Sequence, residues 1–239
     1  DAYFGFALEG AGDVNADGYD DVIIGAQQYD NGSTDEGRAF LYLGSSSGLS
    51  TISAWTAESN QASAYFGFCV KGAGDVNNDG FDDVIISAHY YDNGSTDEGR
   101  VFLYLGDPTG LQTSAAWTAE SNQAGARFGA NLDGGADVNN DGYDDVLIAA
   151  PYYDLTATDE GRVYLYLGTA TGLMTTPTWN NYGNQASAIL HGVAFIGDVN
   201  NDGFEDASTG AALFDNGSVD EGIIYVFYNT GTGLPLTPS

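Results

Sequence analysis

Four short acidic loops carry the residues of this chain that are best suited to chemistry. Each loop spans nine residues, with Asp at position 1, Asn at 3, Asp at 5, Gly at 6 and Asp at 9. Alternate side chains of a tight turn converge on one point, and Gly at position 6 permits the bend that brings the carbonyl of position 7 around. Each loop therefore offers three carboxylates, one amide oxygen and one carbonyl oxygen to a cation.

This oxygen-only donor set favours calcium. Magnesium prefers a smaller octahedral shell and keeps its waters, while zinc prefers His or Cys. We predict about one calcium ion per loop, four in all, which would also hold the fold because each ion offsets the loop's charge. The predicted ligands are Asp13, Asn15, Asp17, Tyr19 (carbonyl) and Asp21; Asp75, Asn77, Asp79, Phe81 (carbonyl) and Asp83; Asp137, Asn139, Asp141, Tyr143 (carbonyl) and Asp145; and Asp198, Asn200, Asp202, Phe204 (carbonyl) and Asp206.

Other interpretations of these loops fit less well. An EF-hand loop runs twelve residues to a bidentate Glu and lies between helices, and neither condition holds here. Dockerin-like and thrombospondin-like calcium repeats share Asp-x-Asp-x-Asp-Gly but lack the spacing described below. Asx-rich turns without an ion would leave twelve ligand carboxylates uncompensated across the four loops.

The loops open at Asp13, Asp75, Asp137 and Asp198, which are 62, 62 and 61 residues apart. Such a constant spacing indicates a repeated supersecondary unit. Each unit contains short runs rich in β-branched and aromatic residues, separated by Gly, Asn, Asp and Pro, and no segment has the length or period of a helix. We predict an all-β fold of four-stranded antiparallel units. A unit of this kind cannot bury both faces alone, so the copies should stack radially as a β-propeller.

The predicted blades span about 1–62, 63–124, 125–186 and 187–239 within a single propeller domain or propeller segment. Trp55, Trp117 and Trp179 lie on the fourth strands of the first three blades, where we expect them to pack between blades. The fourth blade lacks this strand. Its uncovered sheet edge predicts self-association with a neighbouring chain, as a ring or a filament.

Two further motifs resemble a known repeat family. Phe-Gly stands at Phe4-Gly5, Phe66-Gly67 and Phe128-Gly129, and Gly-Ala-Pro-like elements follow at Gly25-Ala26, Ser87-Ala88, Ala149-Ala150-Pro151 and Gly210-Ala211. This pairing resembles the FG-GAP repeat of integrin alpha-chain propellers, which also occurs in bacterial surface proteins and a fungal lectin. The resemblance covers the whole chain and implies a calcium-binding β-propeller. The fourth copy departs from the pattern, with His191-Gly192 in place of Phe-Gly, and integrin propellers have seven repeats.

The amino-acid composition limits the kinds of partner that this chain can bind. The chain has 34 acids against five Lys and Arg, a formal charge of -29, which argues against nucleic acid or an anionic membrane surface. No apolar stretch approaches the length of a membrane span. With two His and one Cys there is no convincing nucleophile and base pair, so we expect no catalytic residues and no enzyme. The family resemblance and the calcium loops imply an extracellular or cell-surface location.

The face opposite the calcium loops should present an aromatic residue beside a carboxylate in every blade. These candidate ligand-binding residues are Tyr29, Asp30, Tyr91, Asp92, Tyr153, Asp154, Phe214 and Asp215. Such pairs suit a protein ligand or stacking on a sugar, but they equally suit packing between blades and capping of turns. Asp-Glu-Gly-Arg recurs at 35–38, 97–100 and 159–162, where we expect the arginines to form ion pairs between blades.

Three functions follow from these patterns. The first is a non-catalytic adhesion, scaffolding or self-assembly module that acts through protein contacts. The second is a lectin-like carbohydrate binder, and the third is a polysaccharide-degrading enzyme that would use a pair of carboxylates.

Overall fold

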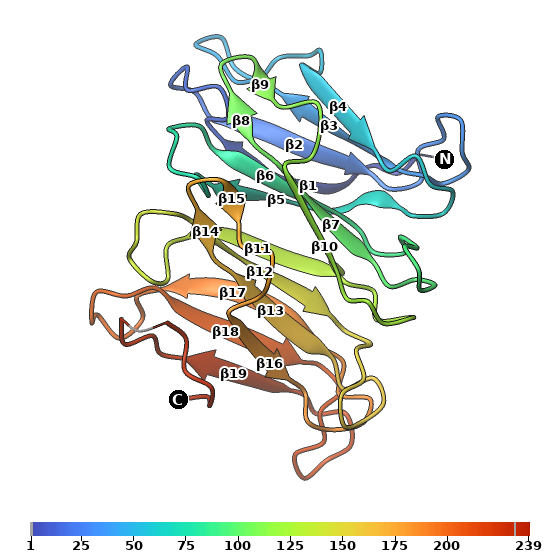
Figure 1. The fold of residues 1–239 in the computed structure, drawn as a ribbon, viewed down its shortest axis with the longest axis vertical. Helices are drawn as coiled ribbons and strands as arrows, with labels where there is room; N and C mark the ends of the chain where they lie inside the picture. The colour runs from blue at the N-terminus through green and yellow to red at the C-terminus, as the bar shows by residue number, and fades with distance from the viewer. Residues whose placement is uncertain (1, 232) are drawn as a thin grey trace.

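The computed structural model describes residues 2–231 and 233–239, and every regular element in them is a β-strand. The repeats form successive antiparallel sheets, here called sheets 1 to 4 (Figure 1). Sheet 1 contains β1 (Phe4–Gly12), β2 (Asp21–Ala26), β3 (Arg38–Tyr42) and β4 (Trp55–Glu58). Sheet 2 contains β5 (Phe66–Gly74), β6 (Asp83–Ala88), β7 (Arg100–Tyr104) and β10 (Trp117–Glu120).

The second half of the chain repeats this arrangement. Sheet 3 contains β11 (Asn131–Ala136), β12 (Asp145–Ala150), β13 (Arg162–Tyr166) and β16 (Trp179–Tyr182). Sheet 4 contains β17 (Leu190–Gly197), β18 (Asp206–Ala211) and β19 (Ile223–Phe227). Two small hairpins, β8 (Gly106–Asp107) with β9 (Gly110–Leu111) and β14 (Gly168–Thr169) with β15 (Gly172–Leu173), lie between the third and fourth strands of sheets 2 and 3.

The sheets stand side by side in a row from the N-terminal sheet to the C-terminal sheet (Figure 1). Their first strands, β1, β5, β11 and β17, contact one another in that order. The second strands β6 and β12 are buried along their whole length, since a neighbouring sheet covers each face. This explains why these runs are apolar at successive positions rather than at alternate ones.

We call the contact between consecutive sheets a joint. In the first joint Ile23 and Leu41 of sheet 1 pack against Phe66 and Ile86 of sheet 2. The second and third joints repeat this core with equivalent residues. The prediction of an all-β fold of stacked antiparallel sheets is therefore confirmed.

The fourth sheet differs from the others in two ways. Within the described residues, β19 pairs only with β18, so its outer edge has no partner strand. In addition, Leu190 and not His191 takes the position of Phe66 and Phe128, because its N–H donates to the carbonyl of Glu160 as theirs donate to Glu36 and Glu98. The alignment of His191-Gly192 with Phe-Gly was therefore wrong by one residue: an aliphatic side chain fills the same buried place.

Candidate functional site

Each acidic loop connects the first and second strands of its sheet and is organised by its own side chains. In the first loop Asp13 accepts hydrogen bonds from the N–H groups of Asp17, at 3.0 Å, and Gly18, at 2.7 Å. Asn15 also accepts from the Asp17 N–H at 3.0 Å, and Asp17 accepts from the Tyr19 N–H at 3.1 Å. The other three loops repeat all four bonds. The side chains at positions 1, 3 and 5 thus stabilise the turn by accepting hydrogen bonds from the backbone N–H groups of positions 5 to 7.

The Asp at position 9 anchors the loop to the sheet. Asp21 is buried and accepts from the N–H of Val14 at 3.1 Å and from the N–H of Gly44 at 2.8 Å. Asp83, Asp145 and Asp206 are also buried and make the same two bonds. This carboxylate therefore joins the start of the loop to the end of the third strand.

In the first three loops the pKa of the Asp at position 9 is raised. Burial, reinforced by the charges at positions 1 and 5, raises the pKa of Asp83 to about 7, although two backbone N–H groups act in the opposite direction. The pKa of Asp145 is raised to about 7 for the same reasons, and the pKa of Asp21 is also raised. The carboxylates at positions 1, 5 and 9 are therefore close enough to repel one another.

The donor chemistry of the loops fits a hard cation. Carboxylate, amide and carbonyl oxygens are the ligands that calcium takes, and an oxygen that already accepts one N–H keeps a second lone pair. Within residues 2–231 and 233–239, the structure brings no three His, Cys, Asp or Glu side chains into an arrangement that could hold a metal ion. The loop donors instead face backbone amides. The assignment of the predicted ligands, including the carbonyls of Tyr19, Phe81, Tyr143 and Phe204, thus stays a prediction.

Consecutive loops are tied together by an acid that we did not single out from the sequence. Asp82, at position 8 of the second loop, accepts from the Asp13 N–H at 2.8 Å and donates its own N–H to the Asp13 carbonyl at 3.2 Å. Asp144 makes the same pair of bonds to Asp75. The first three loops consequently lie next to one another on one face. The signal was present in the sequence, since every loop has an acid at position 8.

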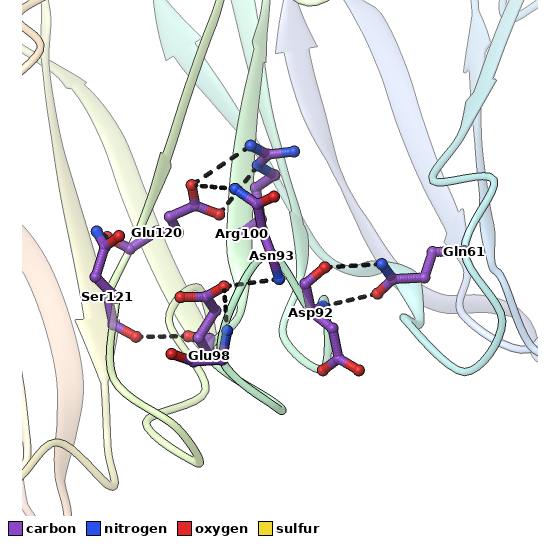
Figure 2. Close-up of polar contacts among 9 residues, drawn as sticks. Gln61, Asp92, Asn93, Glu98, Arg100, Glu120 and Ser121 are labelled. Atoms are coloured by element: carbon purple, nitrogen blue, oxygen red, sulfur yellow. Dashed lines mark hydrogen bonds and ion pairs between the residues drawn. The ribbon is translucent and has the colours of Figure 1, made fainter.

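On the opposite face, glutamines of the linkers between sheets bind the polar loops. Gln61, which precedes sheet 2, accepts from the Asp92 N–H at 2.7 Å and donates to the Asp92 carbonyl at 2.9 Å (Figure 2). Gln123 and Asp154 repeat these two bonds, as do Gln185 and Asp215. In sheets 2, 3 and 4 the polar loop between the second and third strands is thereby fixed to the linker that enters the sheet.

A buried glutamate shapes the same polar loops. Glu98 accepts from the N–H of Asn93 at 2.7 Å, and its carbonyl accepts from the Ser121 hydroxyl at 2.7 Å (Figure 2). Glu36 and Glu160 occupy the same position in sheets 1 and 3. At Glu160 burial opposes ionisation, but three backbone N–H groups and a hydroxyl outweigh it and lower the pKa.

The predicted ligand-binding residues have structural contacts of their own. Tyr29, Tyr91 and Tyr153 are half-buried, each beneath an arginine at 5.3, 4.8 and 5.0 Å from the ring centre, and Phe214 packs edge-on against Tyr225. The carboxylates of Asp30, Asp92, Asp154 and Asp215 are exposed, and each accepts an N–H from within its own loop. A ligand role for these residues remains a prediction beside these packing and capping contacts.

The arginines do not bridge blades as we expected. Arg38 lies 3.8 Å from Glu58, and Arg100 lies 3.4 Å from Glu120, in each case within one sheet. The reason is the register, because the third strand pairs directly with the fourth and sets Arg38 opposite Glu58. The packing role of the tryptophans is confirmed: Trp117 lies edge-on against Tyr166 of the next sheet, as Trp55 and Trp179 do with their equivalents.

His89 lies in an aromatic cluster at the second joint. Its ring centre is 3.7 Å from that of Phe68 and 4.2 Å from that of Tyr90, and Arg127, in the linker that enters sheet 3, lies over Tyr90 at 4.7 Å. Burial and the nearby arginine lower the pKa of His89 to about 3. The imidazole is therefore neutral at ordinary pH and has the character of a packing group.

Comparisons with known proteins agree with this architecture. The FG-GAP repeat family matches residues 4–42, 72–104 and 128–166, which lie in sheets 1, 2 and 3. Integrin alpha-3 of Cricetulus griseus is 32% identical over 181 residues, covering 75% of this chain and 16% of that protein. Integrin alpha-5 of Xenopus laevis is 29% identical over 174 residues, covering 69% of the chain and 16% of that protein.

The chain thus spans about a sixth of the length of these relatives. Among the described residues no helix has the length and apolar character needed to cross a membrane. The acidic loops and the antiparallel sheets recur at all three places that the family match covers, and two of the Phe-Gly pairs, Phe4-Gly5 and Phe128-Gly129, lie within it. The chain carries FG-GAP repeats at these three places and is similar to integrin alpha chains.

Proposed function

We propose that this chain is a non-catalytic, calcium-stabilised FG-GAP propeller module that acts outside the cell in adhesion or scaffolding through protein contacts. The observation that carries the proposal is the fourfold recurrence of one loop geometry. All four loops offer the same oxygen donors, make the same internal hydrogen bonds and end in the same buried Asp. The similarity to integrin alpha chains supports an adhesion role and an extracellular or cell-surface location.

Calcium would act here as a structural ion. In the second loop Asp75, Asn77, Asp79, the carbonyl of Phe81 and Asp83 would hold it, and its positive charge would offset the repulsion among three carboxylates. Because Asp82 and Asp144 couple consecutive loops, an ion in one loop also stabilises the position of the next. The calcium face would then support the joints, and the opposite face with its polar loops would remain available to a partner.

A direct test is calcium titration by calorimetry. We expect about four ions per chain, and about three after Asp79→Ala, since that change removes a ligand from one loop. Asp97→Asn is the matched control, because Asp97 lies outside the loops and has a backbone φ of 51°, which Asn also adopts. Equal ion counts for wild type and Asp79→Ala would contradict the ligand assignment, and no heat with calcium would contradict the proposal.

Thermal unfolding tests the structural role of the ion. At free calcium about tenfold above the dissociation constant, each site contributes ~1.4 kcal/mol, so four independent sites contribute about 5 to 6 kcal/mol. For a chain of this size we expect chelation to lower the melting temperature by roughly 10 to 20 °C. A melting temperature that chelator leaves unchanged would refute a stabilising ion.

A carbohydrate ligand is the second candidate, and one observation favours it. A polar hollow of about 330 Å³ lies between sheets 2 and 3 and is lined by Glu120, Arg162, Tyr164 and Tyr166, among others. The Tyr164 hydroxyl is buried without a hydrogen-bond partner among the described residues. Binding on a glycan array that is lost after Tyr164→Phe, which removes only this hydroxyl, with stability retained, would favour a lectin function at this hollow. Array binding that survives Tyr164→Phe but is lost after Tyr91→Ala or Tyr153→Ala would assign the sugar to the aromatic residues of the polar loops instead, and array binding unaffected by all three changes would exclude both sites.

A further inference from the structure

The N-terminal end of the row carries one uncovered half of a joint. Inside the row Phe66 and Phe128 are 0% exposed because the preceding sheet covers them, whereas Phe4, at the same position of sheet 1, is 54% exposed. Leu8 is 66% exposed, while its counterpart Val70 is 3% exposed. We call Phe4 and Leu8 the head face. It is apolar surface of a kind that the other sheets bury.

The C-terminal end carries the complementary half. Ile224 in β19 is 73% exposed, although its counterparts Ala39, Val101 and Val163 are 0% exposed beneath the next sheet. Beside Ile224 lies a hollow of about 600 Å³ whose lining includes Gly210, Ala211 and Gly222. We call Gly210, Gly222 and Ile224 the tail face.

The internal joints show what fits such a hollow. At the first joint the Phe66 N–H donates to the Glu36 carbonyl at 3.0 Å, and a Cβ on Gly37 would lie 2.2 Å from the Phe66 carbonyl oxygen. The Phe-Gly end of one sheet is thus seated directly on a glycine of the sheet before it. Gly99 and Gly161 make equally close contacts at the second and third joints.

At Gly222 this seat is open. A Cβ there would meet only atoms of its own sheet, the nearest being the Ala212 carbonyl oxygen at 3.0 Å. A Cβ on Gly5, which follows Phe4, would meet nothing within 4 Å. Within the described residues, the Phe4 N–H and the Glu221 carbonyl also lack the inter-sheet bond that their counterparts make.

We propose that the head face of one copy of this chain docks on the tail face of a second copy, with Phe4 and Gly5 seated at Gly210 and Gly222. A second copy is the partner because the chain already builds this contact three times from the same repeat, while its own head and tail lie at opposite ends of the row (Figure 1). The contact is heterologous, so successive copies give a ring or a filament. This inference rests on the proposed scaffolding function, whose partner it names.

Two variants at opposite ends test the contact. Leu8→Asp and Ile224→Asp place a charge on the head face and the tail face, at side chains exposed enough to tolerate it in one copy. Ile52→Asp is the matched control, since Ile52 is 78% exposed and its counterparts Ser114 and Thr176 are exposed too, so no joint covers that position.

Light scattering over a concentration series gives the mass. At about 0.15 M salt, which screens the charge of -29, we expect wild type and Ile52→Asp to exceed the monomer mass as concentration rises. Leu8→Asp and Ile224→Asp should each weaken association about 100-fold or more, because the contact would bury an unpaired carboxylate. Wild type that stays monomeric, or three variants that behave alike, would overturn the proposal.

A mixing experiment isolates the head-to-tail geometry. Leu8→Asp keeps a good tail and Ile224→Asp keeps a good head, so an equimolar mixture should form a one-to-one dimer and nothing larger. A mixture that stays monomeric, or one variant that still self-associates fully, would overturn the geometry. Calcium titration of Ile224→Asp tests the ion separately from the docking. If this variant binds the full number of calcium ions but wild type does not associate, only the docking is refuted. If it binds no calcium but wild type associates as expected, only the calcium proposal is refuted.

Discussion

The cost of removing the repeated phenylalanine should depend on which sheets cover it. Phe66→Ala and Phe128→Ala each remove a ring that is fully buried in a joint, so we expect each to lower the free energy of unfolding by about 4 kcal/mol. Phe4 packs edge-on against Phe40, at 5.3 Å, and is 54% exposed. Roughly half of the burial of a phenylalanine is worth ~1 kcal/mol, and no cavity is left behind, so Phe4→Ala should cost about 1 kcal/mol.

Urea unfolding at low protein concentration, followed by tryptophan fluorescence, measures this series. Trp55 lies in the same joint as Phe66, and Trp117 lies in the same joint as Phe128, so the fluorescence reports on both positions. A cost at Phe4 equal to that at Phe66 under dilute conditions would refute the reasoning that the preceding sheet provides the difference. If copies dock head to tail, the cost at Phe4 should rise with protein concentration while the cost at Phe66 stays constant.

Three further changes follow from other contacts. Burial lowers the pKa of His89 from 6.5 to about 3, so below pH 6.5 the unfolded chain takes up a proton that the folded chain excludes. The free energy of unfolding should therefore fall by ~2 kcal/mol between pH 7 and pH 5 because of this group. His89→Phe should remove that part of the pH dependence in urea unfolding measured at each pH. Trp117→Phe should cost about 1 to 2 kcal/mol of unfolding free energy, because it removes the 3.0 Å bond from the indole N–H to the Met174 carbonyl. Glu98→Ala should cost about 2 to 4 kcal/mol in urea unfolding and speed proteolysis of the polar loop, while Glu98→Gln, which keeps an acceptor oxygen, should cost about half as much; equal costs would refute its role as acceptor.

The sequence predicted the sheets well because period and residue type agree. Acidic loops about 62 residues apart, each followed by an apolar run, leave few alternatives to stacked antiparallel sheets. The sequence did not predict equally well which side chains pair across neighbouring strands. Arg38 lies two residues after Glu36 in the sequence, but the pairing of β3 with β4 sets it opposite Glu58, twenty residues further on. Such partners depend on register, which local composition does not specify.

The candidate site shows the same division. The positions of Asp13 and Asp21 in the loop were readable from spacing, yet the second role of Asp21, as acceptor for the Gly44 N–H, depends on the end of the third strand. The role of Asp82 was missed because it acts on the preceding repeat rather than its own. Contacts between repeats are nearly invisible to an analysis that reads one repeat at a time.

The joint, rather than the single repeat, is the unit that explains this protein. The strands β6 and β12 are buried along their whole length because a neighbouring sheet covers each face, so they can be apolar at every position. In sheets 1 and 4 one face has no neighbouring sheet among the described residues, and equivalent positions are exposed there. The positions equivalent to Ile224 in the other sheets hold alanine or valine and are buried. Ile224 is exposed, yet it is apolar like its buried counterparts. Apolar surface on both ends of a chain with a charge of -29 favours a partner that brings the missing half of the joint.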